Sequence, residues 1–94
     1  MDVFEYLENV KDKESFIAFV KALAEEREQA EKMERENPLR YQWGGALDWQ
    51  NSDISAFLWA TLECFEERPL KKAMAEEPSW RGFAEFLYFG KIYE

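Results

Sequence analysis

Cys64 carries the strongest intrinsic nucleophile in the 94-residue sequence. At about 100° per residue along the helix expected around it, its side chain falls beside Phe57 on the apolar face. Burial raises the pKa of a thiol, and the chain contains no histidine that would activate the sulfur. Ser52 stands at an expected helix start, where a serine hydroxyl usually caps the helix. We therefore predict no catalytic residue and expect a protein that is not an enzyme.

Acidic side chains are abundant, but their spacing does not form a metal or cofactor site. A di-iron site in a bundle needs Glu-x-x-His on two helices, and a zinc site needs several Cys or His ligands. Asp48 to Asp53 lacks the central glycine and terminal glutamate of a calcium loop. Gly44-Gly45 lacks the following Lys and Ser or Thr of a phosphate loop. We predict neither a metal nor a cofactor.

The charge balance limits the class of partner. Twenty acidic residues oppose twelve basic ones, which gives a net charge of −8. Such a chain binds poorly to the phosphates of nucleic acids or to an anionic membrane. The N-terminus lacks the basic start of a signal peptide, and the longest apolar run, Ile54 to Leu62, is about half a membrane span. We therefore expect a cytoplasmic protein with no direct nucleic-acid or membrane contact.

Aromatic residues are the second unusual feature of the composition. Four Trp, four Tyr and eight Phe exceed what the thin core of such a small chain normally uses. Trp43 and Trp49 flank Gly44-Gly45, and Asp48 lies beside the second tryptophan. Two interpretations remain open: the loop closes the open end of the fold as a lid, or its rings form an anchor, surrounded by acids, for a protein partner.

Three aromatic residues on expected helices are further candidates for contact with a partner. Trp59 lies at the margin of the apolar face of its helix. Phe86 and Phe89 lie outside the apolar face of the last helix. They give this helix a second apolar side, which favours a homo-oligomer. The candidate interaction residues are therefore Trp43, Asp48, Trp49, Trp59, Phe86 and Phe89.

Hydrophobic periodicity predicts the elements that must position these residues in the first half of the chain. A short helix follows Asp2, with an apolar period over 3–10. A second helix over 13–36 follows the N-cap Asp12 and ends at Asn37-Pro38. Because this helix is longer than a compact domain needs, its last two turns should stand clear of the core or fray. Its core-facing residues are Phe16, Phe19, Val20 and Leu23.

The second half of the chain predicts an ordered loop over 39–50 and two more helices. Asn51 or Ser52 caps a helix that starts near residue 54 and ends before Pro69. The last helix runs from about 78–80 to 91, and residues 70–77 are either a short helix or an irregular link. The expected apolar stripe of the third helix is Ile54, Phe57, Leu58, Thr61, Leu62 and Phe65.

No segment shows the sustained alternation of a strand. We therefore predict one all-α domain over residues 1–94, a small bundle of about four helices with an ordered aromatic loop between the second and third. The ending 91–94 should fold back and bury Ile92 and Tyr93.

Three sequence elements resemble a known family. They are Trp49-Gln50-Asn51-Ser52-Asp53-Ile54-Ser55-Ala56-Phe57-Leu58-Trp59-Ala60, Trp80-Arg81-Gly82-Phe83-Ala84-Glu85-Phe86-Leu87 and Lys91-Ile92-Tyr93-Glu94. The family consists of small bacterial proteins and is catalogued only as a domain of unknown function. The resemblance implies a bacterial cytosolic protein and brings no activity, cofactor or catalytic residue.

We expect a non-enzymatic protein-interaction module. A basic protein would suit its acidic surface, as in an immunity or antitoxin-like protein that blocks a basic nuclease, because complementary potentials speed encounter. One alternative is an acidic mimic of nucleic acid, which predicts regularly spaced carboxylates over 25–36. Another is a carboxylate-based enzyme of unknown substrate, which needs a pocket with at least one carboxyl of raised pKa.

Overall fold

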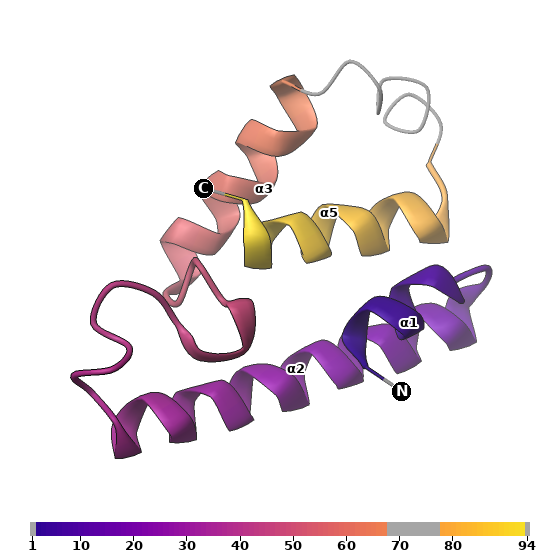
Figure 1. The fold of residues 1–94 in the computed structure, drawn as a ribbon. Coiled ribbons are helices and arrows are strands. Elements are labelled where there is room, and N and C mark those ends of the chain that lie inside the picture. The colour runs from indigo at the N-terminus through magenta and orange to yellow at the C-terminus, as the bar shows by residue number, and fades with distance from the viewer. Residues whose placement is uncertain (1, 68–77, 94) are drawn as a thin grey trace.

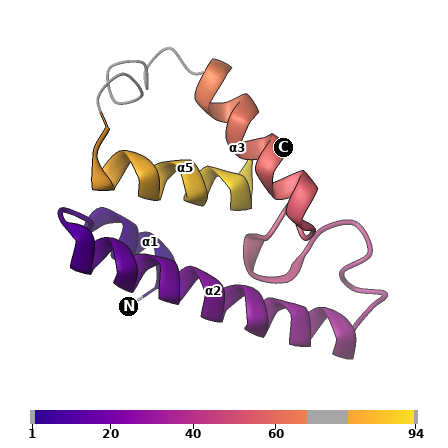
Figure 2. The ribbon, with the colours of Figure 1, turned by 180° about the vertical axis from the view of Figure 1, so that it is seen from behind.

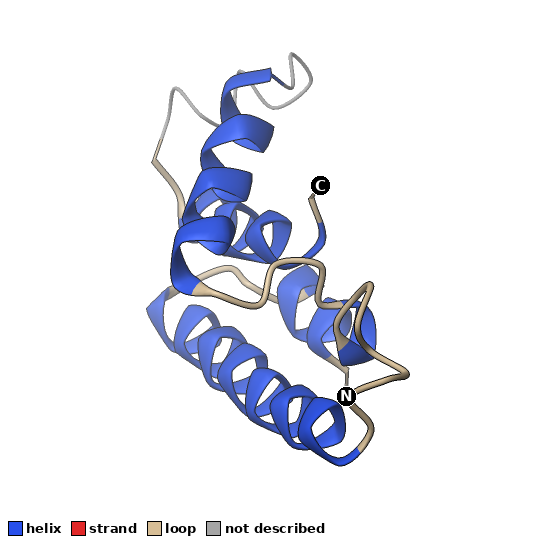
Figure 3. Ribbon diagram, turned by 90° about the vertical axis from the view of Figure 1, so that its left-hand side faces the viewer, coloured by secondary structure: helices blue, strands red, loops and turns tan. Residues whose placement is uncertain are grey.

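Helices form all the regular structure in residues 2–67 and 78–93, which are the residues that the structure describes (Figure 3). The computed structural model contains α1 (Val3–Glu8), α2 (Lys13–Glu36), the short 3-10 helix η1 (Ala46–Asp48), α3 (Ile54–Glu67) and α5 (Trp80–Ile92). The predicted all-α class is confirmed. The open prediction for residues 70–77 lies outside the described residues. None of the described helices has both the length and the apolar composition needed to span a membrane.

Side-chain caps fix where α1 and α2 begin. The Glu5 amide donates to Asp2 Oδ1 over 2.9 Å, and the Ser15 amide donates to Asp12 Oδ1 over 2.8 Å. The Asp12 amide donates in return to Ser15 Oγ over 3.0 Å, which completes a capping box. α1 lies beside the N-terminal half of α2 (Figure 1). The buried residues of this pair and of the link between the two helices are Val3, Leu7, Val10, Phe19 and Leu23.

The last turns of α2 do not stand clear of the core, contrary to the prediction. The chain turns back after Asn37, and the loop that contains η1 lies along this part of the helix (Figures 1 and 2). Ala30 is fully buried there, together with Ala46 and Trp49 of the loop. The loop packs apolar side chains against these turns. The helical period of α2 alone does not predict this contact.

α5 is the central helix of the fold. α1 and α2 lie on one side of it and α3 lies on the other (Figures 1 and 2). α3 and α5 approach closely at Gly90, where a Cβ atom would lie 2.5 Å from Thr61 Cγ2 and 2.8 Å from the Phe57 ring. Since real Cβ contacts are longer than this, the hydrogen of a glycine is what lets the two helices come together here.

α3 buries only part of the predicted stripe: Thr61 is fully buried and Phe57 packs against the core. Its buried residues are the small side chains Ala60, Thr61 and Cys64, whereas Ile54 and Leu58, predicted as core, are 80% and 50% exposed. The close approach at Gly90 favours small residues on the side of α3 that faces α5. The large aliphatic side chains Ile54, Leu58 and Leu62 lie beside this contact with α5, where no other described helix packs closely against them.

Candidate functional site

Trp49 connects the loop after α2 to three helices. Its buried indole donates from Nε1 to Glu26 Oε1 of α2 over 2.9 Å and stacks on Phe57 of α3, with ring centroids 6.2 Å apart. Two cations lie over the ring: Arg27 Cζ at 5.3 Å from the centroid and Lys91 Nζ of α5 at 5.9 Å. Of the two interpretations of this loop, Trp49 therefore has the role of the lid.

A largely buried ion pair joins α2 to α5 beside this ring. Lys91 Nζ lies 2.6 Å from Glu26 Oε1, and Lys91 is only 6% exposed. The sequence analysis missed this pair, although one signal for it was present. Lys91 follows Leu87 by four residues and Ala84 by seven, so the helical period places it on the core face of α5.

Asn51 holds the C-terminal end of α5. Its Nδ2 donates to the carbonyl oxygens of Gly90 over 3.0 Å and Tyr93 over 2.7 Å, and the Gln50 amide donates to the Lys91 carbonyl over 2.9 Å. Carbonyls of a last helical turn have no donor within their own helix, so these bonds satisfy them. The predicted fold-back of the C-terminal residues is half right: α5 itself extends to Ile92, and Ile92 and Tyr93 are half-buried.

The prediction that Asn51 or Ser52 caps α3 was wrong. The Ala56 amide donates to Asp53 Oδ1 over 2.8 Å, and the Phe57 amide donates to the Asp53 carbonyl over 3.0 Å. Asp53 is thus the N-cap, because Asn51 has turned toward α5 and Ser52 is exposed.

Replacing Asn51 with alanine is expected to lower the free energy of unfolding by about 1–3 kcal/mol, because it leaves part-buried carbonyls without their donor. Urea unfolding followed by circular dichroism measures this change. Ser52→Ala is the matched control and should change stability by less than about 0.5 kcal/mol. Equal effects of the two substitutions would show that Asn51 does not hold α5.

Arg27 and Glu34 clamp the loop to α2. Arg27 donates from Nη2 to Glu34 Oε1 over 2.8 Å and from Nη1 to Glu34 Oε2 over 3.1 Å, while the Ala46 amide donates to Glu34 Oε2 over 3.0 Å. The Arg27 hydrogen bonds hold the pKa of Glu34 below its ordinary value of 4.5; burial opposes this and the Ala46 amide adds to it. Glu34 is therefore ionised and paired at neutral pH.

This lowered pKa predicts a loss of stability in acid. A carboxyl with a lower pKa in the folded chain stabilises the fold above its unfolded pKa, and this contribution is lost as pH falls through the folded pKa. We expect the urea midpoint to fall as pH drops below about 4.5, and to fall less steeply in Glu34→Gln. Urea titrations between neutral pH and pH 3 compare the two proteins. Identical slopes would contradict this role for Glu34.

A row of large apolar side chains lies exposed along α3. We call Ile54, Leu58, Trp59 and Leu62 the α3 face. Ile54 is 80% exposed, Trp59 65% and Leu58 50%. Ile54, Leu58 and Leu62 follow one another at intervals of four residues and so line up along one side of the helix. Contiguous exposed apolar side chains of this kind mark interaction sites more often than ordinary surface.

A groove of about 420 Å³ lies next to the α3 face, between α2 and the start of α3. Ile54, Phe57 and Leu58 line it from α3, and Arg27 and Glu31 line it from α2. We call it the α2–α3 groove. Because Ile54 and Leu58 belong to both features, the face and the groove form one continuous surface.

Acidic residues lie near both ends of this surface. Asp53 precedes α3, Glu63 and Glu66 lie within it, and all three are exposed. Glu31 of α2 keeps 51% of its side chain exposed beside Arg27. The sequence of α3 contains no lysine or arginine. A protein that docks on the α3 face therefore meets an apolar centre with negative charge near both ends.

Two of the sequence elements that resembled a family meet in this region, since Gln50 and Asn51 donate to carbonyls of residues 90–93 beside the start of α3. The family of unknown function DUF7660 matches residues 12–94. The chain belongs to this family. The predicted resemblance is thereby confirmed. No curated protein and no solved structure matches the chain. The DUF7660 match begins at Asp12, the N-cap of α2, and includes both the α3 face and the residues that hold α5.

The residues predicted for interaction do not gather at one place in this DUF7660 chain. Trp43 is 89% exposed in the loop and Trp49 is buried below it. Asp48 is exposed, with a left-handed φ of 66°. Trp59 lies on the α3 face as its position at the margin of the stripe predicted.

Phe86 and Phe89 do not form the exposed patch that was predicted for self-association. Both are half-buried, because α5 is the central helix and has neighbours on two sides. The residues that sequence reasoning missed are Ile54, Leu58 and Leu62, which it assigned to the core.

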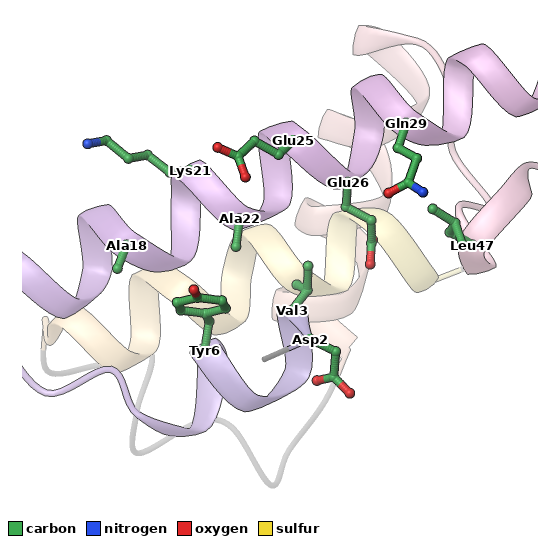
Figure 4. Close-up of a pocket in the computed structure, with 10 residues that line it drawn as sticks. All are labelled: Asp2, Val3, Tyr6, Ala18, Lys21, Ala22, Glu25, Glu26, Gln29 and Leu47. Atoms are coloured by element: carbon green, nitrogen blue, oxygen red, sulfur yellow. The ribbon is translucent and has the colours of Figure 1, made fainter.

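A second hollow, of about 510 Å³, lies between α1 and α2. Figure 4 shows Val3 and Tyr6 of α1 facing Ala18 and Ala22 of α2. The nearby acids Asp2 and Glu26 already act inside the protein, as the N-cap of α1 and as the partner of Lys91. Within residues 2–67 and 78–93, no His, Cys, Asp and Glu side chains gather as metal ligands would.

Proposed function

We propose that this protein is a non-enzymatic protein-interaction module that binds a basic protein through the α3 face. The observation that carries the proposal is the exposure of the row Ile54, Leu58 and Leu62 together with the neighbouring Trp59. Tryptophan surrounded by apolar contacts is a typical hot-spot residue of protein interfaces. An immunity or antitoxin-like role in the bacterial cytoplasm is the specific version that we favour.

Charge favours a basic partner over a second copy of the chain. Asp53 lies at one end of the α3 face, and Glu63 and Glu66 lie toward the other. In a two-fold contact between two α3 faces, acids of one copy would approach acids of the other. The net charge of −8 also opposes self-association, because two copies of the chain repel each other. Lysine and arginine around an apolar patch would instead complement both features.

The alternative functions have less support. A nucleic-acid mimic needs regularly spaced outward carboxylates over 25–36. Glu25, Glu28, Glu31 and Glu36 are exposed there. Glu26 and Glu34 interrupt the series, because they turn inward to Lys91 and Arg27. An enzyme of the carboxylate type needs a carboxyl with a raised pKa. The described carboxyls whose pKa departs clearly from its ordinary value are Asp12, Glu34 and Asp53, and hydrogen bonds lower all three.

Affinity capture from the native host tests the proposal. Tagged wild type is compared with Ile54→Asp/Leu58→Asp, and with Ile17→Asp, which changes an exposed apolar residue of α2 outside the α3 face. We expect a partner rich in lysine and arginine that the wild type and Ile17→Asp retain and the double variant loses. Purified partner and protein then give the dissociation constant directly. A double variant with unchanged unfolding confirms that the loss is local.

Two results would reject the proposal: no captured protein depends on the α3 face, or the dependent protein has an acidic surface. The immunity version of the proposal makes a more specific prediction. The captured partner is then a nuclease, and equimolar protein should abolish its activity.

A further inference from the structure

We infer that the part of the partner seated on the α3 face is an amphipathic α-helix with basic ends, and that it places an apolar side chain in the α2–α3 groove. This inference rests on the proposed function and names the chemistry of its partner. It draws on the shape of the row on α3, the continuity of the groove with that row, and the positions of the charges.

The spacing of the exposed residues on α3 suits another helix. Ile54, Leu58 and Leu62 form a ridge of residues four apart, and such ridges fit into the grooves between side-chain rows of a second helix. A strand has nothing to pair with here, because the backbone N–H and C=O groups of α3 bond within the helix. Helix-in-groove binding is therefore the mode of peptide recognition that this surface supports.

The groove offers the helix a place for one of its apolar residues. Its volume of about 420 Å³ falls in the range of about 300–1,000 Å³ that is usual for ligand sites. The stacked rings of Trp49 and Phe57 line it beside Leu58. Trp49 is buried and held by Glu26, so this part of the wall is already formed without a partner.

The charges place basic residues at both ends of the bound helix. Glu31 and Asp53 line the groove at the start of α3, and Glu63 and Glu66 lie exposed about three to four turns further along. Arg27, the cation that lines the groove, is already bound by Glu34 and lies 3.6 Å from Glu31. Lysine or arginine of the partner would thus meet acids at either end and an apolar row between them.

A synthetic amphipathic peptide of leucine and lysine, about 18 residues or five turns long, tests this inference. A scrambled peptide of the same composition is the matched probe. Binding is measured by calorimetry, and its site is mapped by amide chemical shifts of the protein. We expect the helical peptide to bind at least about tenfold more tightly than the scrambled one and to shift the amides of the α3 face and of Arg27 and Glu31.

Variants separate the groove from the face. Ser52 is exposed and lines the groove, so Ser52→Trp should fill it and weaken the helical peptide about fivefold or more, as should Leu58→Asp. Ile17→Asp should leave binding unchanged. Equal affinity for both peptides, no binding by either, or normal binding to Ser52→Trp would overturn the inference. If the host partner needs the α3 face but binds Ser52→Trp normally, this inference fails while the proposed function stands.

Discussion

Replacing Trp49 with alanine is expected to lower the free energy of unfolding by about 3–5 kcal/mol. The indole is buried, stacks on Phe57 and donates to Glu26, so its removal leaves a cavity under the loop and a lost hydrogen bond. Small domains are stabilised by only about 5–15 kcal/mol in total. The expected loss is therefore a large share of the total stability. Urea unfolding followed by far-ultraviolet circular dichroism measures the loss.

Trp43→Ala is the matched control for this prediction. Trp43 lies in the same loop and is 89% exposed, so its loss should change stability by less than about 0.5 kcal/mol. If both substitutions lower the free energy of unfolding equally, Trp49 does not close the core. The side of the α2–α3 groove that Trp49 lines would then not be preformed.

Glu26→Gln is expected to cost about 3 kcal/mol, the lower end of the range for removing one partner of a buried ion pair. The substitution leaves the charge of Lys91 in a site where this residue is only 6% exposed. The lower end applies because the Glu26 side chain keeps 20% of its surface exposed. Glutamine still offers an oxygen to Trp49 Nε1, so the loss measured by urea unfolding reports mainly the missing charge.

The double variant Glu26→Gln/Lys91→Met separates charge from packing. Because it leaves no unpaired buried charge, it should be more stable than Glu26→Gln alone. Glu28→Gln, an exposed glutamate on the same helix, should have an effect below about 0.5 kcal/mol. Additive losses in the double variant would mean that the two side chains do not act as a pair.

The helices themselves were predictable because their start signals are local. The predicted bounds of α2 agree with the structure, since Asp12 and Ser15 cap it through bonds between residues three apart. α5 begins after Ser79, whose Oγ accepts from the Gly82 amide over 2.9 Å. Signals of this kind depend on neighbours in the sequence and not on the rest of the fold.

The orientation of α3 was not predictable from the sequence. The helix is apolar on most sides between Ile54 and Cys64, so its period does not identify the face that meets the core. Gly90, far along the chain, decides this by allowing close contact with Thr61. Phe57 and Thr61 of the predicted stripe do face the core. The candidate site was missed because Ile54, Leu58 and Leu62, assigned to the same stripe, are left exposed.

The residues that hold α3 against α5 are far apart in the sequence, and this affects the order in which the helices fold. α1 and α2 are adjacent in the chain. The hydrogen bonds of Asn51 to Gly90 and Tyr93, in contrast, join residues about forty positions apart. Closing such a loop costs entropy before any contact forms, so the α3–α5 unit should form last and open most readily. A partner bound to α3 would then slow amide hydrogen exchange in this unit more than in α1 and α2.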